Sequence, residues 1–92
     1  MLEKKIEIIN KLGLHVRAAT KLVQTATLFD LDLSITCNGQ TADAKSIMEV
    51  FMLAAVVGST VTLTASGDDE AEEKKAITTL TELFLNRFDE KE

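Results

Sequence analysis

Residues 31–37 alternate apolar and polar side chains, which is the pattern of a strand with one buried face. The dipeptide Asn38-Gly39 follows at once and favours the type I′ turn of a two-residue β-hairpin. We therefore expect the chain to return through a short strand near residues 40–43. Cys37 continues the inward phase of the first strand, so we interpret it as a packing residue.

Strand and helix patterns also alternate along the rest of the chain. Strand-like alternation predicts strands over residues 4–9 and 60–65, and in the first of these Ile6 and Ile8 lie on the buried side. Helices are predicted over residues 16–28 and 46–53. A last helix has the apolar stripe Ile77, Leu80, Leu83 and Phe84.

The last helix also has a start signal. Asp68-Asp69 precede Glu72 at the spacing of a capping box, and Glu72 and Glu73 place negative charge where a helix start favours it. The predicted order is βαββαβα, an α+β fold. Four short strands share one apolar face, and three amphipathic helices on one side can cover it. We expect residues 1–92 to form a single domain.

Composition excludes several classes of function. The formal net charge of −5 argues against nucleic-acid binding, which needs a basic surface. No apolar run reaches the roughly 18 residues of a membrane span, and the first residues lack the apolar core of a secretion signal. One histidine and one cysteine make no metal-binding set, and no glycine-rich nucleotide loop is present, so we expect no metal or cofactor. The single cysteine favours a cytoplasmic protein.

His15, the only histidine, stands where a loop meets a predicted helix. Gly13 permits a tight backbone entry, and the first N–H groups of a helix attract anions because they lack intrahelical partners. Arg17 adds a charged donor fork suited to phosphate oxygens. A neutral imidazole has a nitrogen lone pair that can act as a nucleophile. These residues are compatible with phosphoryl transfer to His15, although a histidine at a helix start is more often a cap or a surface residue.

The stretch 13–19, Gly-Leu-His-Val-Arg-Ala-Ala, resembles the active-site signature of the histidine-containing phosphocarrier family of the bacterial phosphotransferase system. The resemblance extends to Lys-Ser-Ile-Met at residues 45–48 and to Gly-Ser-x-Val at residues 58–61. It implies an open-faced sandwich with a four-stranded antiparallel sheet. The family usually has proline where this chain has Ala18. Alanine is a good helix former, so we expect the helix to persist.

The resemblance also implies a reaction. His15 would accept a phosphoryl group through Nδ1 from the phosphohistidine of the general enzyme I, and would donate it to a histidine of a sugar-specific EIIA component. Arg17 and the first helical N–H groups would stabilise the charge. We therefore predict a monomeric, stoichiometric carrier that works within an enzyme chain and is not a catalyst alone.

Two alternatives differ from this reaction. The opening residues 7–15 and the closing residues 86–90 resemble carriers of the nitrogen-regulatory branch, whereas residues 45–48 resemble the sugar-linked type. The other alternative is a regulatory module that binds partners without transfer. The presence of His15 argues against this module, and only Ala18 supports it.

Residues 46–57 are apolar almost all round, with Glu49 as the only charge. Two apolar stripes fit the core equally, and periodicity does not choose between them. The first stripe is Ile47, Val50, Phe51 and Ala54; the second is Val50, Leu53, Ala54 and Val57. In both cases several apolar side chains stay exposed, which indicates a partner surface; the alternative is a homodimer seam or a loosely packed helix. By resemblance, the docking residues are Ile47, Met48 and Phe51.

Ser46 has two interpretations. Ser46 and Glu49 have the spacing of a capping box, which by itself explains a serine at a helix start. The resemblance adds that a dedicated kinase phosphorylates the serine at this place in some bacteria. Such a phosphate would add negative charge inside the apolar docking patch. We therefore treat Ser46 as a cap and as a candidate regulatory phosphorylation site, with a kinase/phosphorylase as a possible partner.

Overall fold

The computed structural model of the chain describes residues 1–89, and its elements follow the predicted order βαββαβα. The elements are β1 (Leu2–Glu7), α1 (Val16–Ala26), β2 (Asp32–Cys37), β3 (Gln40–Asp43), α2 (Ile47–Met52), β4 (Thr60–Ser66), α3 (Glu70–Leu85) and the 3-10 turn η1 (Arg87–Asp89). The turn η1 is not among the predicted elements, because its residues all have positive φ and follow no helical period.

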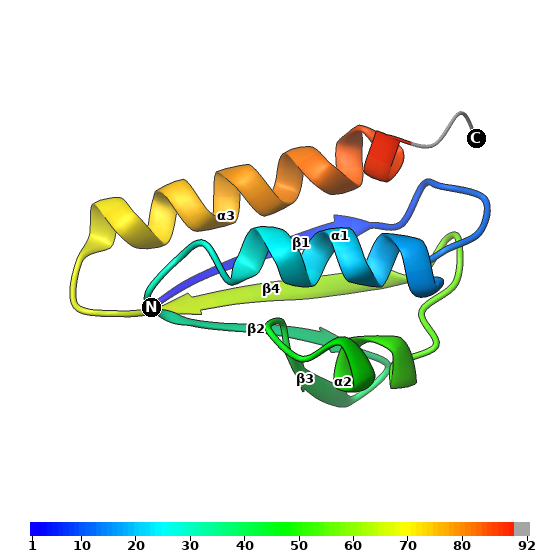
Figure 1. Cartoon of the computed structure of the whole chain (residues 1–92), viewed down its shortest axis with the longest axis horizontal. Coiled ribbons are helices and arrows are strands. Elements are labelled where there is room, and N and C mark those ends of the chain that lie inside the picture. The colour runs from blue at the N-terminus through cyan, green and yellow to red at the C-terminus, as the bar shows by residue number, and fades with distance from the viewer. Residues whose placement is uncertain (90–92) are drawn as a thin grey trace.

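The four strands form one antiparallel sheet in the order β1-β4-β2-β3, which confirms the predicted fold class. The helices α1, α2 and α3 cover one face of this sheet (Figure 1). In the β2–β3 hairpin, Cys37 pairs with Gln40 across a two-residue loop. Asn38 and Gly39 have φ values of 52° and 81°, the two positive values that a type I′ turn requires. The predicted hairpin is therefore confirmed.

The core lies between the sheet and the helices. The strands contribute inward side chains at alternate positions, namely Ile6, Leu33, Ile35, Cys37, Val61, Leu63 and Ala65. The helix α1 contributes Ala18, Ala19, Leu22, Val23 and Ala26 at helical spacing. The predicted burial of Ile6, Ile8 and Cys37 is confirmed. The rings of Phe84 and Phe88 meet edge to face, with centroids 4.9 Å apart, and this contact joins η1 to the core.

Neither of the two predicted stripes of α2 is buried as a whole. Val50 and Leu53 are buried, whereas Ile47 and Phe51 are 43% and 44% exposed. The helix ends at Met52, and Ala54 takes a positive φ of 50°. Ala54 and Val57 therefore lie beyond the helix, where helical spacing no longer decides which side chains face the core. The expectation that several apolar side chains of this segment stay exposed is confirmed.

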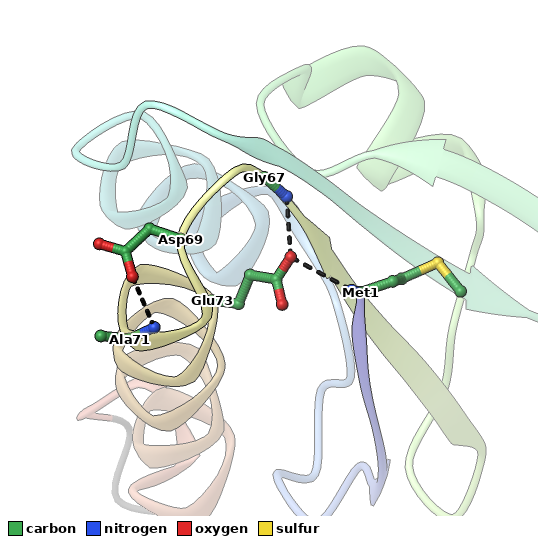
Figure 2. Close-up of polar contacts among 5 residues, drawn as sticks. All are labelled: Met1, Gly67, Asp69, Ala71 and Glu73. Atoms are coloured by element: carbon green, nitrogen blue, oxygen red, sulfur yellow. Dashed lines mark hydrogen bonds and ion pairs between the residues drawn. The ribbon is translucent and has the colours of Figure 1, made fainter.

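The start of α3 is held by two carboxylates (Figure 2). Asp69 is the N-cap, and its Oδ1 accepts a hydrogen bond of 2.9 Å from the Ala71 N–H. Glu73 is 3% exposed, and its Oε2 accepts a hydrogen bond of 2.9 Å from the Gly67 N–H. The same oxygen lies 3.3 Å from the amino group of Met1. Glu73 thus connects α3 with the residue before β1 and the residue after β4, a role beyond the helix-start charge that the sequence predicts.

Candidate functional site

His15 is the N-cap of α1 and is partly exposed. Its backbone is extended, with φ of −76° and ψ of 178°, and its carbonyl oxygen accepts the first hydrogen bond of the helix from Ala19 at 2.8 Å. The ring atom Nδ1 accepts a hydrogen bond from the Arg17 N–H, with 3.3 Å between the nitrogens. The two interpretations of His15, a cap and a nucleophile, therefore do not exclude each other, because the capping atom is also the candidate nucleophile.

Arg17 and Ala18 occupy the second and third positions of the helix. The Arg17 side chain is exposed, whereas Ala18 is fully buried. The helix begins at Val16 although the chain has no proline here, which confirms that it persists with Ala18. The site therefore presents a positive side chain and a helix start beside one imidazole.

The loop before His15 is fastened to the segment that follows α2. Gly13 has a φ of 66°, and the Leu14 N–H donates a hydrogen bond of 2.9 Å to the Ala55 carbonyl oxygen. The β1–α1 and α2–β4 loops meet at one end of the sheet (Figure 1). Because Leu14 directly precedes His15, this bond ties the candidate nucleophile to the α2 side of the molecule.

The helix α2 and its following loop form an apolar hollow next to His15. The hollow has a volume of about 360 Å³ and is lined by Leu12, Leu14, His15, Phe51, Met52, Ala54, Ala55 and Val56. The structure thus brings Phe51 together with His15. Ile47 and Met48 are exposed but do not line this hollow, because they lie at the start of α2.

Sequence reasoning missed two kinds of residue at this site. Leu12 and Val56 line the hollow, but they lie in loops, where no periodic pattern marks them. Asn10 is fully buried, and its Nδ2 donates a hydrogen bond of 2.7 Å to the Gly13 carbonyl oxygen. Asparagine is a common loop residue, so nothing in the sequence distinguishes this buried one.

Ser46 is the N-cap of α2, and its Oγ accepts a hydrogen bond from the Glu49 N–H at 3.3 Å. The second half of the predicted capping box is different. The Glu49 carboxylate accepts the N–H of Asp43 at 3.0 Å, and the Ser46 N–H donates instead to the Asp43 carbonyl oxygen. The tight turn between β3 and α2 brings Asp43 within reach of Glu49. Ser46 therefore caps the helix and does not line the hollow beside His15.

Within residues 1–89, no group of three or more His, Cys, Asp or Glu side chains is placed to hold a metal ion. In the same residues, no helix combines the length and the apolar character that crossing a bilayer requires.

Comparisons with known proteins agree with the fold. The family model described as the PTS HPr component phosphorylation site matches residues 2–85. The chain is 52% identical to the phosphocarrier protein HPr of Cupriavidus necator over the full length of both chains. A crystal structure of HPr from Thermoanaerobacter tengcongensis matches with a TM-score of 0.91 and 40% identity, and the match covers all of both chains.

Another similar structure is a dimer. Crh, the catabolite repression protein of Bacillus subtilis, is 36% identical, with a TM-score of 0.71. The match covers 95% of this chain and 97% of that chain. Its crystal structure is described as a dimer with a swapping domain.

Proposed function

The chain belongs to the HPr family of phosphocarrier proteins of the phosphotransferase system, and we propose that it carries a phosphoryl group on Nδ1 of His15. The observation that carries this proposal is the position of Nδ1 at the start of α1, within hydrogen-bond distance of the Arg17 N–H. A lone pair of Nδ1 that accepts this hydrogen bond is also the lone pair that attacks phosphorus, and the released N–H can then donate to a phosphoryl oxygen.

The transfer step exchanges one N–P bond for another. Nδ1 of His15 attacks the phosphorus of a donor phosphohistidine, the new N–P bond forms, and the N–P bond of the donor breaks with its electron pair returning to the donor imidazole. One proton passes overall from the His15 ring to the donor ring. Because reactant and product are both phosphohistidines, the step needs mainly positioning and charge stabilisation. Arg17 supplies positive charge for the phosphoryl oxygens.

The donor is the phosphohistidine of enzyme I, and the acceptor is a histidine of a sugar-specific EIIA component. Both partners dock on the exposed apolar surface of α2, through Ile47, Met48 and Phe51. The apolar hollow supports the proposal of a docking surface here, since Phe51 and His15 both line the hollow. An apolar patch next to a reacting group excludes water when a partner covers it, which protects the transferred group from hydrolysis.

Ser46 is a regulatory phosphorylation site in this proposal, with a kinase/phosphorylase as its partner. A phosphate on Oγ would take the place of the cap and would stand close to the Glu49 carboxylate. The added charge of about −1.5 to −2 would therefore weaken the link between Glu49 and Asp43 as well as the docking of an acidic partner.

The protein acts in the cytoplasm as a monomer, and the nitrogen-regulatory branch is the alternative acceptor system. This alternative rests on residues 7–15 and 86–90, of which Glu90 lies outside the described residues. Sedimentation of the unmodified chain tests the monomer, and a concentration-dependent dimer contradicts it.

The test is phosphorylation by phosphoenolpyruvate and enzyme I, followed by intact mass measurement. We expect a gain of one phosphate that is lost in acid, and its transfer to an EIIA protein on mixing. The key variant is His15→Asn, because an asparagine Oδ1 can still accept the Arg17 N–H and keep the cap while the nucleophile is absent. His15→Asn is therefore expected to fold and to take no phosphate.

A control variant and a comparison of acceptors separate the outcomes. Ser46→Ala should keep the acid-labile phosphate, since the serine is not the acceptor in this reaction. If the phosphoryl group passes to a nitrogen-branch acceptor but not to a sugar-specific one, the proposed acceptor is wrong, whereas the proposed role of His15 stands. If the folded chain gains no phosphate with enzyme I of either branch, the carrier function is wrong. The alternative of a regulatory module that binds partners without transfer would then replace it.

A further inference from the structure

Asn10 is one of two polar or charged residues that are buried in residues 1–89, and it lies five positions before His15. A buried amide is stable only when its polar groups have partners, because it has lost its bonds to water. Its Nδ2 donates to the Gly13 carbonyl oxygen at 2.7 Å, and the Gly13 N–H donates to the Asn10 carbonyl oxygen at 3.1 Å. The turn from Asn10 to Gly13 is thus closed by a side-chain bond in addition to the backbone bond.

The peptide unit between Gly13 and Leu14 is fixed at both of its polar groups. Its carbonyl oxygen accepts from the Asn10 amide, and its N–H donates to the Ala55 carbonyl oxygen at 2.9 Å. A peptide plane held at both ends cannot rotate without breaking a buried hydrogen bond. Without such bonds it would rotate easily, because one of its two flanking residues is a glycine.

This peptide plane helps to set the direction in which the chain enters His15. Only the Leu14 α-carbon separates it from the next peptide unit, and the Leu14 side chain is 3% exposed. The direction of the chain into His15 is therefore set by the plane and by a packed side chain. The contact between His15 Nδ1 and the Arg17 N–H depends on that direction.

We propose that Asn10 is a positioning residue for phosphoryl transfer at His15, acting through the Gly13–Leu14 peptide. This inference rests on the proposed function. Asn10 itself touches neither the reacting nitrogen nor the phosphoryl group. Its amide narrows the range of ring orientations, so that more encounters with a donor find Nδ1 in line with the phosphorus.

The test compares Asn10→Ala, Asn10→Ser and the unmodified chain in transfer from enzyme I, with kcat and KM measured separately. Alanine has no donor, and the serine hydroxyl is too short to reach the Gly13 oxygen. We expect both variants to lose about tenfold to a hundredfold in kcat, while KM changes little because the exposed surface of α2 is intact. Rates are calculated per folded molecule from urea unfolding of each variant.

Ile35→Val is the matched control, because it removes one methyl group from a fully buried residue of β2 and lowers the free energy of unfolding by about 0.5–1.5 kcal/mol. We expect its kcat to stay at the level of the unmodified chain. A comparable loss of kcat in Ile35→Val would assign the Asn10 effect to general stability and overturn the proposal. Unchanged kcat in the Asn10 variants, or loss of the fold in both of them, would overturn it as well.

An NMR readout separates this inference from the proposed function. In the Asn10 variants we expect faster hydrogen exchange at the Leu14 amide and a shifted Arg17 amide resonance, both relative to Ile35→Val. An unmodified chain that takes no phosphate refutes the proposed function, and the NMR readout then decides whether Asn10 orients the ring. Unchanged Leu14 and Arg17 amides would refute the positioning role by themselves.

Discussion

Gly13 lies so close to Ala55 that a Cβ atom on Gly13 would stand 2.5 Å from the Ala55 carbonyl oxygen. Gly13 also has a φ of 66°, in the left-handed region that favours glycine. The glycine therefore meets two separate demands, a backbone conformation and a close approach of two loops. A glycine elsewhere in the chain meets only the first of them, which makes the two effects separable.

We expect Gly13→Ala to lower the free energy of unfolding by more than Gly39→Ala does. Gly39 has a φ of 81°, but a Cβ atom there would meet nothing within 4 Å, so its substitution adds only backbone strain of roughly 1–2 kcal/mol. At Gly13 the same strain is joined by displacement of the Ala55 loop. Urea unfolding of both variants measures the difference. Equal losses in the free energy of unfolding would mean that moving the Ala55 loop away from residue 13 costs no measurable free energy.

Arg17 offers a test of charge at the helix start. Its side chain is exposed, so Arg17→Ala should change the free energy of unfolding by no more than about 0.5 kcal/mol. The variant keeps the backbone N–H of residue 17, which donates a hydrogen bond to Nδ1 of His15. We expect phosphoryl transfer to fall at least about tenfold, since a preorganised positive donor is lost. Arg17→Lys should recover part of the transfer rate. An unchanged transfer rate in Arg17→Ala would show that the Arg17 side chain takes no part in the reaction.

Ser46 caps a helix of six residues, which has little stability of its own. Loss of its hydroxyl in Ser46→Ala leaves the Glu49 N–H without that acceptor, and we expect a loss of about 1 kcal/mol in the free energy of unfolding. Ser66→Ala, at the exposed end of β4, is the control and should have almost no effect. If both serines behave alike, the cap contributes nothing measurable to the fold.

The contacts of Glu73 with Gly67 and Met1 are shown in Figure 2, and they predict how the stability of the chain responds to acid. The hydrogen bond from the Gly67 N–H, helped by the Met1 amino group and opposed by burial, lowers the pKa of the Glu73 carboxyl from its ordinary value of 4.5. A lowered pKa in the folded state means that the contribution is complete above pH 4.5 and is lost as the pH falls through the lowered value.

We therefore expect Glu73→Gln to be less stable than the unmodified chain at neutral pH, with a difference that shrinks as the pH falls below 4.5. Urea unfolding at a series of pH values measures this difference. Glu70→Gln is the control, because Glu70 is an exposed residue of the same helical turn. A difference between Glu73→Gln and the unmodified chain that stays constant with pH would show that ionisation of Glu73 does not stabilise the fold.

The features that the sequence predicts correctly are those with one local cause. The Asn38-Gly39 turn follows because few other residues tolerate positive φ at both positions, and the inward side chains of β2 follow from strict alternation. The end of α2 could not be predicted, because a segment that is apolar all round has no polar face to mark its last turn. The loop that follows α2 is held by the hydrogen bond from the Leu14 N–H to the Ala55 carbonyl oxygen, a contact between residues distant in the sequence.

The candidate site divides in the same way. The placement of His15 and Arg17 together at the start of α1 could be predicted, because they are neighbours in the sequence and a helical pattern follows them. The hollow beside His15 and the bond from Asn10 to Gly13 could not, since each depends on how loops fold against one another. The buried position of Glu73 is another example, because an acidic residue in a first helical turn is usually exposed.

Ala18 stands where the family usually has proline, and the structure indicates how proline would fit. The first hydrogen bond of α1 is donated by Ala19 to the His15 carbonyl oxygen, so the Ala18 N–H precedes the hydrogen-bonded turns of the helix. We expect Ala18→Pro to keep the helix, to leave phosphoryl transfer unchanged, and to raise the free energy of unfolding by about 0.4–1 kcal/mol through a stiffer unfolded chain.

The neighbouring alanine provides the control for this substitution. Ala18 and Ala19 are both fully buried, but Ala19→Pro would remove the donor to His15 and should lower the free energy of unfolding by about 3 kcal/mol or more. Thermal and urea unfolding of the two variants, together with their transfer rates, measure the contrast. If Ala18→Pro were as damaging as Ala19→Pro, the helix start of this chain would have adapted to alanine, with no space left for the proline ring.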